Sequence, residues 1–143
     1  MGCVTSFLIL AHALSPLSGV LCAKETMNFL SKLFRWEKGR QLSGYDKMLL
    51  LGSKWFIKFD VYLLRFKEGS EIKPHTDKVD NGKHYRLNIV LKQALEGGEF
   101  ICSSPIYQSS RIKFFRPDTC EHSVTKVIRG NRYLLSIGWV NGT

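Results

Sequence analysis

The residues with the clearest chemical potential open the stretch PHTDKVDNGKHYRLNIVLKQALEGGEF, which runs from Pro74 to Phe100. His75 and Asp77 are two residues apart there, and on an extended backbone their side chains point to the same side. A polar turn would explain this pair, and so would part of a metal site. Two histidines and one carboxylate suit a non-haem Fe(II) centre, because they leave positions open for O₂ and a chelating cosubstrate. The choice therefore depends on a third ligand further along the chain.

The third ligand is expected from a distant strand, and His122, in RPDTCEHSVTKV, is the candidate for it. His84 is the next choice, but it is too near His75 in the sequence to belong to a facing sheet. Cys120 lies two residues before His122, so a zinc site made of Cys120, His122 and His75 is an alternative. That alternative leaves Asp77 without a role. Each of these side chains could also be an ordinary surface group beside a turn.

A chelating anionic cosubstrate would also need a fixed cation, and Arg132 follows His122 by ten residues. The planar fork of an arginine can hold a carboxylate through two hydrogen bonds. Alternation along RYLLSIGW places a cation, a hydroxyl and a glycine on one face, which is typical of the wall of a small-molecule cavity. This face consists of Arg132, Leu134, Ser136 and Gly138. The other face is predicted to be core and consists of Tyr133, Leu135, Ile137 and Trp139.

The elements that would carry these residues differ between the two parts of the chain. Residues 24–51 are predicted to be mainly helical, with a break at GRQLSGYD and a short helix over Met48–Leu51. From Trp55 onward, β-formers and turn residues predict about eight strands and a sandwich or barrel. The predicted strands are 55–66, 84–91, 99–104, 111–116, 122–128 and 132–140, with short ones before His75 and near Thr119.

These segments together resemble the Fe(II)- and 2-oxoglutarate-dependent dioxygenases of the prolyl-4-hydroxylase-like type. The resemblance covers residues 55–140 and depends on RFKEGSEIKPHTD, RLNIVLKQALEGGEF and FRPDTCEHSVTKVIRGNRYLLSIGW, in the family's order and spacing. It implies a mainly β protein with N-terminal helices, in which the strands form a double-stranded β-helix, or jelly roll, and helices pack on one sheet.

The resemblance also implies the roles of individual residues. His75, Asp77 and His122 would bind Fe(II), and Arg132 would pair with the distal carboxylate of 2-oxoglutarate. With O₂, the cosubstrate would be decarboxylated to succinate and CO₂ while a substrate C–H bond is hydroxylated.

The chain departs from the family pattern at the tyrosines that often contact 2-oxoglutarate. Phe66 stands at the first such place, and no tyrosine follows RLNIVL. Tyr62, four residues before Phe66, Asn88 and Ser136 are the candidates for these contacts.

Composition sets the range of partners. The chain has 143 residues, which suits one domain, and its apolar content of 44% predicts a real core. Twenty-one basic against twelve acidic residues give a net charge of +9, which favours anionic partners. We expect a substrate such as a protein side chain, for example proline. Oxidation of a nucleic-acid base, supported by charge alone, and a non-catalytic jelly-roll binding protein are the alternatives. Four cations, Arg86, Arg111, Lys113 and Arg116, would form a basic rim or a solvated strand face.

The first residues allow several interpretations. Residues 1–23 form an apolar segment without Lys, Arg, Asp or Glu, which a signal peptide, a membrane anchor or a core helix would explain. MGCVTS also fits an N-myristoylation pattern. The catalytic domain is expected over residues 24–143, in the cytoplasm or, if residues 1–23 are a signal or anchor, in the secretory pathway. The four cysteines form no Cys-x-x-Cys pair and are predicted to be mostly free thiols.

Overall fold

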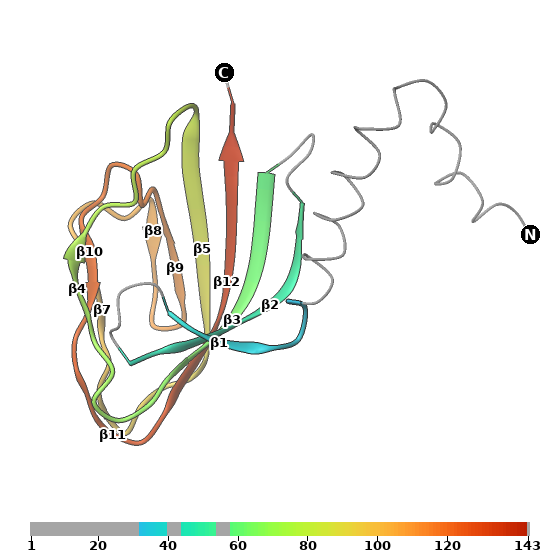
Figure 1. Cartoon of the computed structure of the whole chain (residues 1–143). Helices are drawn as coiled ribbons and strands as arrows, with labels where there is room; N and C mark the ends of the chain where they lie inside the picture. Colours follow the sequence, from blue (N-terminus) through green and yellow to red (C-terminus); the bar gives the residue numbers. More distant parts are fainter. Residues whose placement is uncertain (1–31, 40–43, 54–57, 143) are drawn as a thin grey trace, which may run out of the picture. The chain divides into compact units, whose positions relative to one another are not determined.

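The computed structural model describes residues 32–39, 44–53 and 58–142, which form strands and turns without a helix (Figure 1). The strands are β1 Trp36–Lys38, β2 Asp46–Ser53, β3 Lys58–Phe66, β4 Ile72–His75, β5 Lys83–Lys92, β6 Glu96–Gly97, β7 Phe100–Cys102, β8 Tyr107–Gln108, β9 Ile112–Phe115, β10 His122–Val124, β11 Val127–Arg129 and β12 Arg132–Asn141. Residues Lys32–Thr143 group as one compact unit. No stretch within the described ranges could cross a membrane as a helix.

Two facing sheets organise this unit. The larger has the order β1-β2-β3-β12-β5-β9-β8, and the smaller has the order β4-β10-β7, while β11 and β6 form a short third pair. Strands β12, β3 and β5 are long and pair antiparallel along nearly their whole lengths. Figure 1 shows β4, β7 and β10 on the side opposite β12, β3 and β2. Side chains that alternate along β12 therefore point either between the sheets or away from them.

The strand predictions from Trp55 onward are largely confirmed, although residues 54–57 lie outside the described part. The predicted helix over Met48–Leu51 is wrong, because these residues belong to β2, which pairs with β3. A short apolar run suits either structure, and pairing with a long neighbouring strand decides between them. The short strand expected near Thr119 is also wrong, since Pro117–Thr119 form a turn. Predicted helices over residues 24–31 lie outside the described residues, as does the segment 1–23.

The core lies between the sheets, on the side that was predicted to be a cavity wall. Phe66, Val124, Val127 and Leu134 form its buried cluster. The opposite face of β12 was predicted to be core, but its side chains are only half-buried. The reason is that this face points away from the smaller sheet. Trp139 stacks there in a ladder with Phe114 and Tyr85.

A disulfide joins Cys102 on β7 to Cys120, in the turn before β10. The expectation of mostly free thiols is therefore wrong for these two cysteines, because adjacent strands bring together residues that are 18 positions apart. Bonded to Cys102, Cys120 has no thiolate to offer, so the alternative zinc site with His122 and His75 is excluded.

Candidate metal centre and cosubstrate cavity

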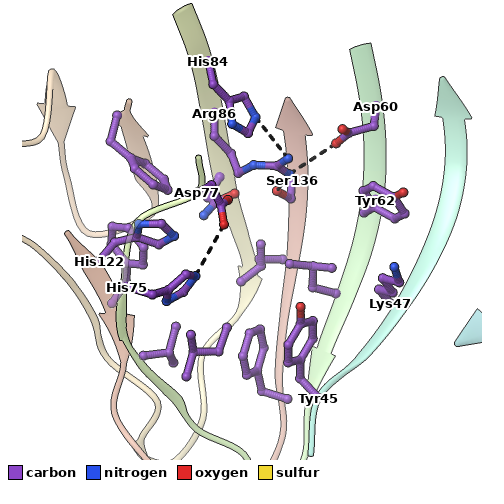
Figure 2. A pocket seen from close by; sticks show the side chains of 18 of the residues that line it. Tyr45, Lys47, Asp60, Tyr62, His75, Asp77, His84, Arg86, His122 and Ser136 are labelled. Atoms are coloured by element: carbon purple, nitrogen blue, oxygen red, sulfur yellow. Dashed lines mark hydrogen bonds and ion pairs between the residues drawn. The ribbon is translucent and has the colours of Figure 1, made fainter. Parts of the chain in front are cut away.

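The three residues predicted as metal ligands come together on the smaller sheet. His75 ends β4 and His122 begins β10, and the two residues are direct partners in the antiparallel register. Asp77 follows His75 by two positions, and one ligand atom from each of the three side chains lies within 4.8 Å of the others. Figure 2 shows the three side chains gathered on one wall of a cavity. Three ligands of these types would leave coordination positions open on a bound ion.

Backbone carbonyls orient both imidazoles. The Nδ1 of His75 lies 2.8 Å from the carbonyl oxygen of Lys73, and the Nδ1 of His122 lies 3.0 Å from that of Cys120. A carbonyl oxygen only accepts hydrogen bonds, so in each ring Nδ1 carries the hydrogen. In the neutral ring, Nε2 is then the nitrogen that keeps a lone pair. A backbone hydrogen bond that fixes the tautomer in this way is typical of metal-binding histidines.

Electrostatics favours the metal-binding state of His122. Burial lowers the pKa of His122 below its ordinary value, and the neighbouring His75 acts in the same direction. The ring is therefore neutral at pH 7 and can donate a lone pair. The Nε2 of His75 lies 3.7 Å from Oδ1 of Asp77, a separation that leaves the carboxylate available to an ion. The backbone N–H of Asp77 donates to the carbonyl of Pro117 at 2.7 Å, which fixes the loop that carries it.

A cavity of about 330 Å³ lies between the two sheets beside these ligands. The four residues predicted to bind the cosubstrate all line it together with the metal-site residues. They are Arg132 and Ser136 on β12, Asn88 on β5 and Tyr62 on β3. Ser136 is paired in register with both Asn88 and Tyr62. One patch across three strands therefore presents the hydroxyl of Ser136, the amide of Asn88 and the phenol of Tyr62 to the cavity.

The guanidinium of Arg132 has the properties expected of a carboxylate-binding group. Only 2% of the residue is exposed, and its Nε and Nη1 have no hydrogen-bond partner in the part of the chain that the structure describes. Burial lowers the pKa of Arg132 to about 10, which still leaves it charged at pH 7. A buried cation without a counter-charge is unfavourable unless an anion joins it. The residues present thus fit a cosubstrate that carries a carboxylate.

Some residues of the cavity were not found from the sequence. Tyr45 lines it next to Phe66, with ring centroids 5.1 Å apart, and Phe66 lies under the Arg132 guanidinium at 5.6 Å. Tyr45 therefore supplies a phenol near the arginine, where Phe66 cannot. Lys47 also lines the cavity, 5.5 Å above the Tyr62 ring. Both residues were missed because their segment was predicted to be a break followed by a helix.

Of the four cations that were expected to form a basic rim or a solvated strand face, only Arg86 lines the cavity. Arg86 lies inside the cavity, whereas Arg116 pairs with Asp118 at the end of β9. Lys113 donates to the carbonyl of Ser109. His84, which was the second choice as a metal ligand, lines the cavity but does not belong to the cluster of His75, Asp77 and His122.

Comparisons with known proteins find similar folds but no similar sequences. No protein-family model matches the chain, and no curated protein matches it in sequence. A prolyl-4-hydroxylase from Pseudomonas putida superimposes with a TM-score of 0.58 at 13% identity, covering 94% of this chain and 91% of its own. The viral collagen prolyl hydroxylase of Paramecium bursaria Chlorella virus-1, described as a 2OG complex, gives 0.50 at 17% identity, covering 91% and 92%. KdgF from Halomonas sp. gives 0.51 at 13% identity, covering 75% and 88%.

These similarities define the class of fold. The chain has a jelly roll of two facing antiparallel sheets, and prolyl hydroxylases are among the proteins with a similar fold. Identities of 13–17% establish the fold and leave the reaction to be argued from the site.

Proposed function

We propose that this protein is an Fe(II)- and 2-oxoglutarate-dependent dioxygenase that hydroxylates a C–H bond of its substrate. The observation that carries the proposal is the placement of two features in one cavity. One is a cluster of two histidines and a carboxylate, and the other is the buried Arg132 with unpaired donors. Either feature alone has ordinary explanations, but a metal site beside an unpaired buried cation suits a chelating dicarboxylate.

His75, Asp77 and His122 would hold the iron. The backbone hydrogen bonds at Nδ1 leave both Nε2 atoms to the ion, and Asp77 adds the negative charge that would keep a divalent cation there. When bound, the iron supplies O₂ activation. The open side of the three-residue cluster faces the cavity, so cosubstrate and O₂ would reach the metal from there.

Arg132 would bind the distal carboxylate of 2-oxoglutarate and so set the position of its oxo-acid end. Ser136, Asn88, Tyr62 and Tyr45 are the polar groups of the cavity that can add hydrogen bonds to the cosubstrate. The buried Oδ1 of Asn88 has no hydrogen-bond partner among the described residues. The apolar side chains of Phe66 and Leu134 exclude water from the Arg132 end and strengthen the ion pair.

A protein side chain such as proline is the substrate suggested by the prolyl hydroxylases with this fold. We do not propose oxidation of a nucleic-acid base, because the net charge of +9 is its only support. The remaining alternative is a jelly roll that binds metal without catalysis.

Turnover of 2-oxoglutarate in the absence of substrate distinguishes a dioxygenase from a non-catalytic jelly roll. The purified protein with Fe(II), ascorbate and 2-oxoglutarate should release succinate slowly in air and stop when the metal is chelated. His122→Ala should abolish this release, whereas Ser110→Ala, at an exposed position between β8 and β9, should preserve it. Release that persists in His122→Ala would refute the metal assignment, and no release at all from the wild-type protein would favour the non-catalytic alternative.

A further inference from the structure

A second arginine of the cavity is held in a site built to receive it. Arg86 on β5 lies opposite Gly138 on β12, and a Cβ on Gly138 would lie 2.6 Å from Nη2 and 2.9 Å from Cζ of Arg86. Its Nη1 donates to Oγ of Ser136 at 2.9 Å and lies 3.3 Å from Oδ1 of Asp60 (Figure 2). The absent side chain at Gly138 and these two contacts fix the guanidinium in place.

Arg86 and the neighbouring His84 each carry an N–H group that donates a hydrogen bond to none of the described residues. The Nη2 of Arg86 lies 3.4 Å from Nε2 of His84, and because arginine cannot accept, Nε2 is the acceptor. Burial lowers the pKa of His84, and the charge of Arg86 acts in the same direction, so the ring is neutral and its hydrogen is on Nδ1. That Nδ1 and the Nε of Arg86 are buried without hydrogen-bond partners. His84 itself is only 8% exposed.

The two arginines of the cavity, Arg86 and Arg132, mark its two ends. Arg86 is in register with Gly138, six residues along β12 from Arg132, which corresponds to roughly 20 Å of strand. In Figure 2 the metal-site side chains lie between the level of Arg86 and that of Tyr45, whose ring stacks on Phe66 at the Arg132 end. A cosubstrate on Arg132 would therefore approach the metal from one end and leave the Arg86 end free.

The side chains that line the cavity carry more positive than negative charge, and the metal and cosubstrate together do not change this excess. The four cationic side chains are Lys47, Lys78, Arg86 and Arg132, and the two carboxylates are Asp60 and Asp77. Fe(II) and the 2-oxoglutarate dianion carry opposite charges of equal size, so the loaded cavity keeps two surplus positive charges. A partly enclosed cavity concentrates such a field and favours an anionic ligand.

We propose that the substrate carries a carboxylate, which Arg86 and His84 bind at the end of the cavity away from Arg132. This inference rests on the proposed function, since it takes the Arg132 end to be filled by 2-oxoglutarate. The carboxylate could belong to a small organic acid or to an acidic peptide side chain, because the chemistry of recognition is the same. Asp60 holds the far side of the Arg86 guanidinium, leaving its Nε edge for the ligand.

Pairs of probes that differ in a single carboxylate test this proposal. N-acetyl-L-amino acids are compared with the matching N-acetyl-L-amino acid amides, and acetyl-Gly-Asp-Gly-amide with acetyl-Gly-Asn-Gly-amide. Binding to the protein loaded anaerobically with Fe(II) and 2-oxoglutarate is followed through the visible charge-transfer band. Loss of a charged hydrogen bond reduces affinity by about tenfold or more, so the acid of a recognised pair should bind at least that much more tightly. The acetyl amino acids would indicate a small acid, and the Asp peptide a peptide substrate.

Variants assign the preference to Arg86. Arg86→Gln should remove it, and Gly138→Ala should do the same because the new Cβ displaces the guanidinium. Lys92→Gln, an equal change of charge at the exposed end of the same strand, should keep it. Equal binding of acid and amide, a preference that survives Arg86→Gln, or no binding by any probe while the band is present would each overturn this proposal and leave the proposed function standing. A wild-type protein without the band would overturn both.

Discussion

The chemistry of the site is concentrated in a few residues whose surroundings are arranged for ligands that bring charge. Backbone carbonyls bind the Nδ1 atoms of His75 and His122, so Nε2 is the nitrogen of each ring that is left for a metal ion. Arg132 is buried, and two of its nitrogens have no hydrogen-bond partner among the described residues. Such groups destabilise the ligand-free protein and become favourable when metal and carboxylate bind. Replacing one of them should therefore raise the stability of the free protein and weaken ligand binding.

Arg132→Met tests this opposition. Removing a buried charge without a partner should raise the free energy of unfolding of the ligand-free protein by about 1–3 kcal/mol. The same change should abolish the extra stability that 2-oxoglutarate gives to the metal-loaded protein. Denaturant titrations with and without cosubstrate measure both effects, and Arg129→Met, on the exposed part of β11, is the control. A variant that is destabilised yet still stabilised by 2-oxoglutarate would show that Arg132 is a structural residue.

The buried histidines predict how stability depends on pH. The pKa values of His122 and His84 are both lowered from 6.5 by burial. Below pH 6.5 the unfolded chain therefore binds protons that the folded chain does not, and the free energy of unfolding should fall as the pH decreases. Urea denaturation of the metal-free protein at pH 7.5 and 5.5 measures this loss. His122→Asn should reduce the loss, and an unchanged pH dependence in that variant would mean that His122 is not the group responsible.

At the scale of elements, tight backbone contacts hold the strands that carry the ligands. Gly97 has a φ of +72°, and a Cβ there would lie 2.1 Å from the carbonyl oxygen of Lys126 across the β6–β11 pair. The disulfide Cys102–Cys120 joins β7 to the turn before β10 and so lies two residues from His122. The disulfide fixes the chain just before His122. The contact at Gly97 fixes the chain between His122 and Arg132.

Gly97→Ala should destabilise the protein more than Gly69→Ala. Both glycines have positive φ, which costs an alanine about 1–2 kcal/mol, but a Cβ at Gly69 would meet nothing within 4 Å. The difference between the two variants in denaturant titration therefore measures the contact with Lys126, and we expect it to exceed about 1 kcal/mol. Equal losses would show that the β6–β11 pair adjusts freely.

Reduction of the disulfide should also be measurable. A cross-link between residues 18 apart is expected to contribute about 2–4 kcal/mol, so a reducing agent should lower the free energy of unfolding by that amount. The double variant Cys102→Ser, Cys120→Ser should be less stable and insensitive to the reductant. A wild-type protein that unfolds identically with and without reductant would contradict the pairing.

The elements also explain which parts could be predicted from sequence. His75, Asp77, His122 and Arg132 line one cavity, as the alternation along strands and the family resemblance led us to expect. Tyr45 and Lys47 were missed because Asp46–Ser53 is a short apolar segment whose state depends on pairing with β3. The disulfide and the Arg86–Gly138 contact depend on strand register, which the sequence does not state.

In the described unit, the jelly roll places the proposed metal ligands at the smaller sheet and the cations Arg86 and Arg132 on the larger one, with the cavity between them. The charge of +9 is partly inside, at Arg86 and Arg132, so it bears on ligands of the cavity as well as on surface partners. The central claim is that Fe(II) and 2-oxoglutarate bind together in this space.

Anaerobic titration with Fe(II) and then 2-oxoglutarate, followed in the visible spectrum, tests that claim most directly. The proposed function predicts a weak metal-to-ligand charge-transfer band that appears only when both Fe(II) and 2-oxoglutarate are present. The band should be lost in His122→Ala and weakened in Arg132→Met, and Arg129→Met should retain it. If the protein does not retain iron, or if it binds iron but shows no band when 2-oxoglutarate is added, then the proposal that the two bind together in this cavity is wrong.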